Sequence, residues 1–244
     1  MEKNEYARMY HLETSFWWYQ ILHELVDSTV GKNKQVGDIK ILDAGCGTGR
    51  MMEILQKYGL VYGIDYSEEA VFLANKRGLD NIEIGNLNEY YFKENCFDTI
   101  TCLDVLYHSD IIDDLSVVQN FHNALKPNGI LIINLPAFEY LKRSHDIVVH
   151  TKKRYRKGVF VSQLKAIGFS EVHASYRMPH LYCIILISKL FAGKRSFKKP
   201  ESDLKELPDW LNSLLVFLGR IENSFIKRGF SIPFGSSLFI VAKK

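Results

Sequence analysis

The sequence predicts an α/β fold in which helices cover both faces of a doubly wound, largely parallel sheet. Three observations lead to this class. Short apolar runs rich in β-branched residues alternate with amphipathic stretches, the order typical of parallel βα units. The first apolar run, residues 39–43, leads into a glycine-rich turn and then into a helix. With 244 residues, 47% of them hydrophobic, the chain is long enough to bury one full core.

The remaining elements follow from the same pattern. Ser67 is a suitable N-cap, and Glu68 and Glu69 come next, where the helix dipole favours acidic side chains. The turn at 126–129 contains Pro and Gly and ends the helix before it. We predict strands at 39–43, 60–64, 82–84, 97–103, 130–135, 172–176 and 236–243, and helices at 51–58, 67–77 and 113–125, with one or two more within 4–31.

The last two predicted strands are far apart in the chain. Roughly 55 residues separate them, many more than a hairpin turn requires. This segment contains two amphipathic stretches, at 181–191 and 211–225. We therefore divide the chain into an N-terminal helical cap at 1–36, an α/β domain at 37–177 and 231–244, and a helical insert at 178–230.

Composition excludes several classes. A formal net charge of +3 is too small to indicate nucleic-acid binding. Four cysteines without C-x-x-C pairing indicate neither a zinc site nor a disulfide framework, so we expect reduced thiols, no metal and a cytoplasmic protein. The N-terminus does not have the pattern of a signal peptide. The apolar run at 181–191 is too short to span a bilayer, which leaves peripheral membrane contact open. The oligomeric state cannot be derived from the sequence.

The glycine-rich turn predicts a nucleotide-type ligand. A dinucleotide fingerprint requires G-x-G-x-x-G, whereas Gly45, Gly47 and Gly49 follow a G-x-G-x-G pattern. Asp43, two residues before the first glycine, would repel a pyrophosphate but would attract a ligand that carries an ammonium and a sulfonium. Asp65 ends the second strand about 20 residues later, where a carboxylate can accept hydrogen bonds from ribose hydroxyls.

These residues resemble the class I S-adenosylmethionine-dependent methyltransferases, whose first strand ends in D-x-G-x-G-x-G and whose second ends in an acidic residue. The resemblance implies a seven-stranded, Rossmann-like methyltransferase fold in which the last two strands pair antiparallel. It implies S-adenosyl-L-methionine as cofactor, with S-adenosyl-L-homocysteine as product. The residues that it assigns to the cofactor are Asp43 for the ammonium, Gly45, Cys46 and Gly47 for the methionine part, Asp65 for the ribose, Tyr66, Asn86 and Leu87 for the adenine, and Leu103 and His108 beside the cleft.

The N-terminal segment is rich in aromatic residues. Phe16, Trp17, Trp18 and Tyr19 are consecutive. They can pack as large core residues on the sheet, or they can form a lid that keeps water from the methyl group and brings π-faces near a cation. We assign Trp18 to this lid.

The segment after the fifth strand is expected to lie at the carboxyl edge of the sheet, where α/β folds bind ligands. His145 and His150 are candidate general bases, and Asp146 is a candidate to orient one of the rings. A subgroup of the family found near surface-sugar and secondary-metabolite enzymes has a similar H-D pair followed by H-x-x-R-R-Y. The alternative is that these residues stabilise only their own loop. The basic run at 152–157 can either bind a phosphate or form solvated surface.

The sequence therefore predicts a methyltransferase that acts on a hydroxyl or amine of a small molecule, with a sugar or lipid-linked glycan as the favoured acceptor. In this interpretation the insert forms a lid on the acceptor side. Two alternatives stay open. One is a protein that binds S-adenosylmethionine without transferring its methyl group, and the other is a nicotinamide-dependent oxidoreductase.

Overall fold

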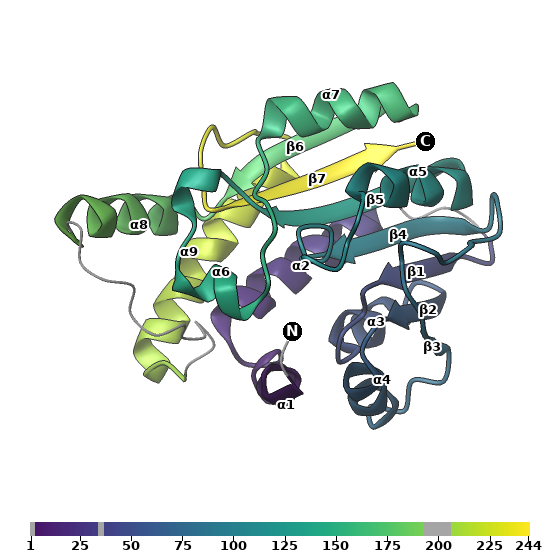
Figure 1. Ribbon diagram of the computed structural model, residues 1–244, viewed down its shortest axis with the longest axis horizontal. Coiled ribbons are helices and arrows are strands. Elements are labelled where there is room, and N and C mark those ends of the chain that lie inside the picture. Colours follow the sequence, from purple (N-terminus) through teal and green to yellow (C-terminus); the bar gives the residue numbers. More distant parts are fainter. Residues whose placement is uncertain (1–2, 34–36, 193–205) are drawn as a thin grey trace.

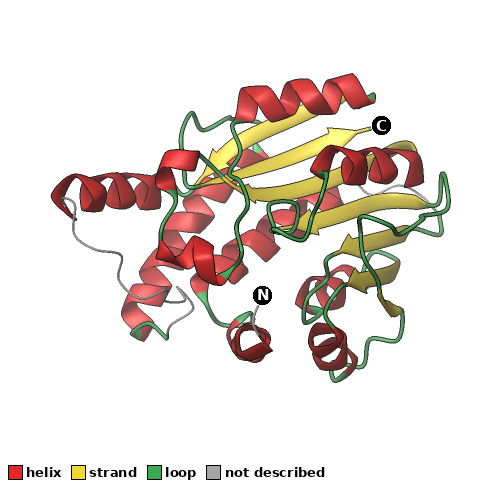
Figure 2. Cartoon of the chain, in the orientation of Figure 1, coloured by secondary structure: helices red, strands yellow, loops and turns green. Residues whose placement is uncertain are grey.

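The structure is a computed structural model that describes residues 3–33, 37–192 and 206–244. Its centre is a seven-stranded sheet with the strand order β3-β2-β1-β4-β5-β7-β6, flanked by helices (Figures 1 and 2). Of the described strands, β7 alone runs opposite to the others, so it pairs antiparallel with both β5 and β6. The strands are β1 Lys40–Ala44, β2 Leu60–Asp65, β3 Ile82–Ile84, β4 Phe97–Leu103, β5 Leu125–Pro136, β6 Glu171–Arg177 and β7 Ser237–Lys243.

The helices lie close to their predicted positions and bring the two ends of the chain onto the sheet. The N-terminal segment forms two helices rather than one. The helices are α1 Lys3–Leu12, α2 Trp17–Lys32, α3 Arg50–Leu55, α4 Glu68–Asn75, α5 Asp114–Ala124, α6 Ser144–Val148, α7 Lys157–Ile167, α8 Pro179–Ala192 and α9 Asp209–Lys227, with a short 3-10 helix, η1, at Glu139–Leu141. The predicted doubly wound fold, with a helical insert before the last strand, is confirmed.

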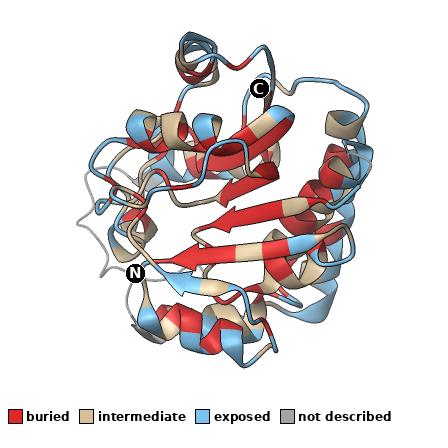
Figure 3. Ribbon diagram, turned by 90° about the vertical axis from the view of Figure 1, so that its right-hand side faces the viewer, coloured by how far each residue is buried: buried red, intermediate tan, exposed pale blue. Residues whose placement is uncertain are grey.

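The core follows from the two-residue period of the strands. In β5, Leu131, Ile133 and Leu135 face the apolar layer that contains α5 and α7, whereas Ile130 and Ile132 face the layer that contains α2 and α3. Because both faces are covered, the central strands are almost entirely buried (Figure 3). The sheet is thus a rigid support for the loops at its carboxyl edge.

The insert packs against the N-terminal helices. The Asn223 amide donates to the Ile21 carbonyl at 2.7 Å, and the Asn212 side chain accepts from the backbone N–H of Trp17 at 2.9 Å. Gly219 allows this approach, because a Cβ there would lie 2.6 Å from the side chain of Ile21. Helices α2 and α9 therefore form one layer, although nearly 200 residues separate them. The exact boundaries that we drew between cap, α/β domain and insert stay predictions.

None of the described helices combines the length and the hydrophobicity that crossing a membrane would require.

Candidate active site

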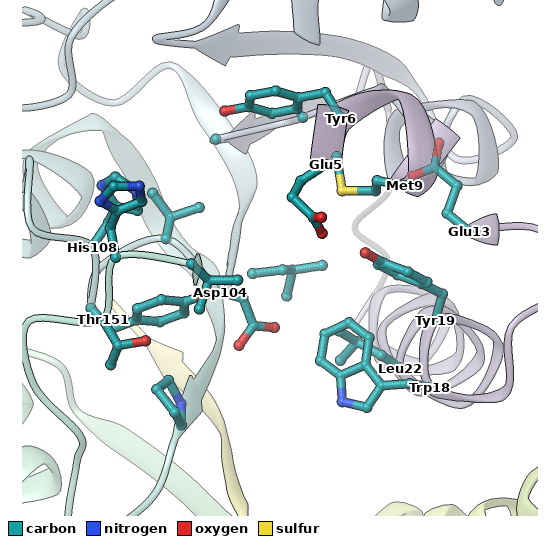
Figure 4. A pocket seen from close by; sticks show the side chains of 18 of the residues that line it. Glu5, Tyr6, Met9, Glu13, Trp18, Tyr19, Leu22, Asp104, His108 and Thr151 are labelled. Carbon is teal, nitrogen blue, oxygen red and sulfur yellow. The ribbon is translucent and has the colours of Figure 1, made fainter. Parts of the chain in front are cut away.

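One large cavity opens at the carboxyl ends of β1, β2 and β4. Its volume is about 1580 Å³, and α1, α2, α8 and α9 contribute to its walls (Figure 4). The structure brings every predicted site residue to this one cavity. The residues are Trp18, Asp43, Gly45, Cys46, Gly47, Asp65, Tyr66, Asn86, Leu87, Leu103, His108, His145 and His150.

The glycine-rich turn forms a tight backbone cradle at one end of the cavity. Gly45 and Gly47 have φ values of 78° and 53°, in the left-handed region that favours glycine. The N–H groups of Gly45 and Cys46 both donate to the Ile64 carbonyl, at 2.7 and 3.0 Å. A Cβ at Gly45 would lie only 2.3 Å from a methyl group of Val105. The turn therefore packs directly against the segment that follows β4.

Two carboxylates flank this turn, as predicted. Asp43 is 2% exposed and accepts a hydrogen bond from the Thr101 hydroxyl at 2.6 Å. Burial raises the pKa of Asp43 to about 7; the Thr101 hydrogen bond opposes the shift, and the negative charge of Asp65 adds to it. Asp65 accepts from the backbone N–H groups of Gly47 and Ser67 at 2.8 and 2.9 Å. A cationic ligand would stabilise both carboxylates, whereas an anionic ligand would add to their repulsion.

The expected adenine side of the cavity is partly apolar. Tyr66 is 68% exposed, and the Phe72 and Ile84 side chains are exposed beside it, while Leu87 is buried. Asn86 differs from the prediction, because its side-chain oxygen already accepts two hydrogen bonds from Asn88, at 3.1 and 2.7 Å. The side-chain oxygen of Asn86, which was expected to accept a hydrogen bond from the adenine, is thus used within the protein.

A residue that the sequence reasoning missed follows β4 directly. Asp104 lines the cavity with φ of 58°, a left-handed conformation that is uncommon outside glycine. Its backbone N–H donates to the Asn134 carbonyl at 2.9 Å, and the Asn134 amide donates to its carboxylate at 2.8 Å. Burial raises the pKa of Asp104 to about 7, although Asn134 and the charge of Arg177 act in the opposite direction. Its place next to Leu103, at the end of a strand that leads to the ligand edge, is the signal that could have identified it.

The histidines lie toward the rim. His108 and His150 have ring centroids 5.5 Å apart, and burial lowers the pKa of His108. His150 is exposed, with φ of 52°, and His145 is on the short helix α6. Both side chains predicted as bases therefore reach the cavity wall from the same loop.

The suggested orienting role of Asp146 is wrong. Its carboxylate accepts a two-pronged hydrogen bond from the Arg154 guanidinium, at 2.8 and 2.9 Å, and also accepts from the Arg143 backbone N–H at 2.7 Å. Although burial opposes the shift, Arg154 holds the pKa of Asp146 below its ordinary value. Asp146 and Arg154 of this segment thus stabilise the loop itself.

The basic run has a structural role as well. Lys153 pairs with Asp114 at 2.6 Å, and Lys152 donates to the carbonyls of Ile111 and Ile112 at 3.2 and 3.0 Å. Lys152 and Lys153 thus anchor the loop to neighbouring segments. They are neither simple solvated surface residues nor free to bind a phosphate.

The N-terminal helices close the cavity as a lid. Glu13, directly after α1, joins this helix to the rest of the domain, because its buried carboxylate pairs with Arg77, which follows α4, at 2.6 Å and accepts from the Thr48 hydroxyl in the glycine-rich turn. Figure 4 shows Met9 and Tyr6 of α1 on one side of the space and Trp18 and Tyr19 of α2 on another. The aromatic cluster therefore serves both predicted roles, since Phe16 and Trp17 belong to a core cluster and all four consecutive aromatic residues also line the cavity.

The far end of the cavity is apolar. Side chains of the insert form this wall together with one aromatic residue of α2. The residues are Trp17, Leu181, Ile184, Ile185, Leu207, Leu211 and Leu215. Within the residues described, no group of three or more His, Cys, Asp or Glu side chains is placed to hold a metal ion.

Comparisons with known proteins agree with this geometry. Residues 42–133 match the family model described as a methyltransferase domain. A ubiquinone biosynthesis O-methyltransferase from Haemophilus ducreyi is 33% identical over 106 residues, which cover 39% of this chain and 44% of that protein. The chain thus spans about half the length of the curated relatives that it matches.

Solved structures show the same fold. A SAM-dependent methyltransferase from Archaeoglobus fulgidus superposes with a TM-score of 0.59 at 19% identity, covering 91% of this chain and 94% of that one. Phosphoethanolamine N-methyltransferase 2 from Haemonchus contortus, in complex with S-adenosyl-L-methionine, gives 0.57 at 20% identity, covering 90% and 52%. With its carboxylate-flanked glycine turn and its strand order, the part of the chain that matches the family model is a methyltransferase domain with the fold of the class I S-adenosylmethionine-dependent methyltransferases.

Proposed function

We propose that this protein transfers the methyl group of S-adenosyl-L-methionine to a hydroxyl of a largely apolar small molecule. The observation that carries the proposal is a single cavity with two chemically different ends. At one end, Asp43 and Asp65 are buried beside the glycine turn, and at the other end the insert supplies an apolar wall. Such a cavity suits a cationic nucleoside and an apolar acceptor placed end to end.

The proposed cofactor contacts are those that the sequence assigned, with one change. Asp43 would pair with the ammonium, the backbone of Gly45–Gly47 would hold the methionine part, and Asp65 would accept from the ribose. Tyr66 and Leu87 would enclose the adenine, with Asn86 contributing through its remaining hydrogen-bonding groups. The bound cofactor supplies an activated methyl group on a sulfonium, so this chain must align the acceptor and exclude water. Leu103, His108 and Trp18 would form walls around that reaction space.

The nature of the acceptor follows from the insert. An apolar wall does not provide the many hydrogen bonds that a sugar would need, so a sugar or glycan is less suitable than an aromatic or aliphatic hydroxyl compound. The name of the Haemophilus ducreyi relative, an O-methyltransferase, supports a hydroxyl acceptor. His145 and His150 remain candidates for the base. If either acts as one, His145→Ala or His150→Ala will lower turnover and leave cofactor affinity nearly unchanged.

Two measurements test the proposal. Isothermal titration should show binding of S-adenosylmethionine and no binding of NAD, because a pyrophosphate would meet Asp43. Release of S-adenosylhomocysteine should then appear with a panel of phenols and catechols but not with sugars. Cofactor binding without release by any acceptor would favour a binding protein, and NAD binding would favour an oxidoreductase.

We also propose that the protein works at a lipid surface, in a cytoplasmic setting consistent with its four free cysteines. Helix α9 presents an exposed apolar stripe in which Trp210, Leu214, Phe217, Ile221 and Phe225 recur at helical spacing. The same helix lines the apolar end of the cavity through its other face. An acceptor dissolved in a membrane would thus enter next to the surface on which the protein rests.

A matched pair of variants tests this contact. Phe217 on α9 and Val159 on α7 are 61% and 59% exposed. Phe217→Ser should reduce co-sedimentation with phosphatidylglycerol vesicles, and Val159→Ser should not. Equal binding by both variants, or a dimer in solution that Phe217→Ser converts to a monomer, would show that the stripe has another partner.

A further inference from the structure

We propose that Asp104 accepts the proton of the acceptor hydroxyl during methyl transfer. The inference rests on the proposed function and names a catalytic residue within it. It starts from the place of one carboxylate in the cavity wall, between the cofactor end and the acceptor end.

The position of Asp104 is fixed on both sides along the chain. Leu103 ends β4 and lines the cavity, and Val105 packs on the glycine turn, where it leaves no room for a Cβ at Gly45. The intervening residue therefore lies beside the turn that is proposed to hold the methionine part of the cofactor. Figure 4 shows its carboxylate directed into the cavity, with Trp18 and Tyr19 on the opposite wall.

One carboxylate oxygen is held and the other is available. Oδ2 accepts from the Asn134 amide at 2.8 Å, while Oδ1 accepts no hydrogen bond from any residue that the structure describes. The left-handed backbone of Asp104, with φ of 58°, is uncommon in a residue other than glycine. Two hydrogen bonds to Asn134 maintain it, so this conformation orients the free oxygen toward the cavity.

A buried chain of polar groups supports this arrangement. Asn134 is fully buried in β5, and its side-chain oxygen accepts from the Arg177 guanidinium at 3.2 Å. Arg177 is itself fully buried in β6 and pairs with Glu222 of α9 at 3.7 Å. The insert is thus connected to Asp104 through one side chain of β5 and one of β6, the two strands that flank β7.

The surroundings of Asp104 suit a group that gains and loses a proton near neutrality. Burial raises the pKa of its carboxyl to about 7, and the positive charges of Arg177 and Arg154 limit the shift. The phenols of Tyr19 and Tyr107 and the thiol of Cys102 also face it, and burial raises the pKa of each of these above its ordinary value. These three groups therefore stay neutral in the range where Asp104 titrates.

The chemistry is balanced without a further reactant. The hydroxyl proton moves to Oδ1 of Asp104 while the acceptor oxygen bonds to the methyl carbon. The carbon–sulfur bond breaks, and its electron pair stays on sulfur. Asp104 then releases the proton to water.

The test compares two acceptors of different acidity, catechol and 4-nitrocatechol, whose hydroxyl ionises more readily. Asp104→Asn keeps the shape of the side chain and removes the base. It should lower kcat/KM for catechol by about 10²- to 10⁴-fold, with a loss at least tenfold smaller for 4-nitrocatechol. Affinity for S-adenosylmethionine should change by less than threefold. Asp80→Asn, at an exposed position outside the cavity, is the matched control.

A readout without turnover separates this inference from the proposed function. The absorbance of bound 4-nitrocatechol reports the ionisation of its hydroxyl. A neighbouring carboxylate raises the pH at which half of the bound compound is ionised, which is the midpoint of the titration. The midpoint should be about one pH unit lower in Asp104→Asn than in the wild type. The inference would be overturned if Asp104→Asn lowered kcat/KM equally for both acceptors. It would also be overturned if 4-nitrocatechol did not bind saturably, or if its midpoint were the same in the variant and the wild type. If the midpoint is higher in the wild type than in Asp104→Asn but the wild type methylates neither acceptor, Asp104 contacts the hydroxyl as inferred. The proposed function would then be wrong.

Discussion

Protonation of Asp43 should control the affinity for S-adenosylmethionine. With a pKa of about 7 in the free protein, this carboxyl is about half protonated at pH 7. A cationic ligand binds the ionised form better, so binding lowers the pKa and releases a proton. Affinity must therefore fall as the pH drops below 7. For one proton, the apparent Kd should be about 25-fold higher at pH 5.5 than at pH 7.5.

Isothermal titration across this range checks the prediction, and Asp43→Asn isolates the residue. The variant loses a charged partner of the ammonium, worth about 1.5–3 kcal/mol, so its affinity at pH 7.5 should fall by about 10- to 150-fold. Its pH dependence should become much flatter. Asp65 and Glu13, which face Asp43, have pKa values raised mainly by burial and will keep part of the slope. A wild-type Kd that is constant between pH 5.5 and 7.5, or a variant that binds as tightly as wild type, would refute the reasoning.

Three further substitutions, one of them with a matched control, test how the site is built. Gly45→Ala should lower the free energy of unfolding by about 2–5 kcal/mol, from left-handed strain and overpacking together. Gly78→Ala, with φ of 76° and open space around it, should show only the strain in the same denaturation assay. Arg77→Met breaks the buried ion pair of the lid, so amide exchange in α1 should quicken about 100-fold, equivalent to about 3 kcal/mol, while exchange in β4 stays slow. In Arg154→Lys, the lysine cannot make the two-pronged bond to Asp146, so the free energy of unfolding measured with urea should fall by about 2 kcal/mol. An unchanged urea midpoint would contradict the role of Arg154 in stabilising the loop.

The cofactor half of the cavity could be predicted because it depends on local sequence and on topology. Asp43 and Asp65 each end a predicted strand, and parallel strands end at the same edge of a sheet. Neighbouring strands in the doubly wound order therefore bring the two carboxylates together, whatever the details of packing. The left-handed glycines follow from the same turn.

The predicted roles of two polar side chains were wrong because each had several possible hydrogen-bond partners. The oxygen of Asn86 bonds to Asn88 two residues on, and Asp146 bonds to Arg154 rather than to a histidine. Which partner each side chain bonds depends on three-dimensional geometry that spacing along the chain does not reveal. The conformation of Asp104 could not be predicted for a similar reason, because Asn134 on the next strand fixes it.

The acceptor end could be predicted least, since it is formed by contacts between distant segments. Helix α9 packs on α2 through Gly219 and Asn223, and Glu222 on the same helix pairs with Arg177 beneath the cavity. A single helix thus contributes to the apolar wall and to the chain of buried polar groups that ends at Asp104. A change in the insert that alters which acceptor fits will also disturb the support of the proposed base. Acceptor choice and proton removal are therefore expected to vary together rather than independently.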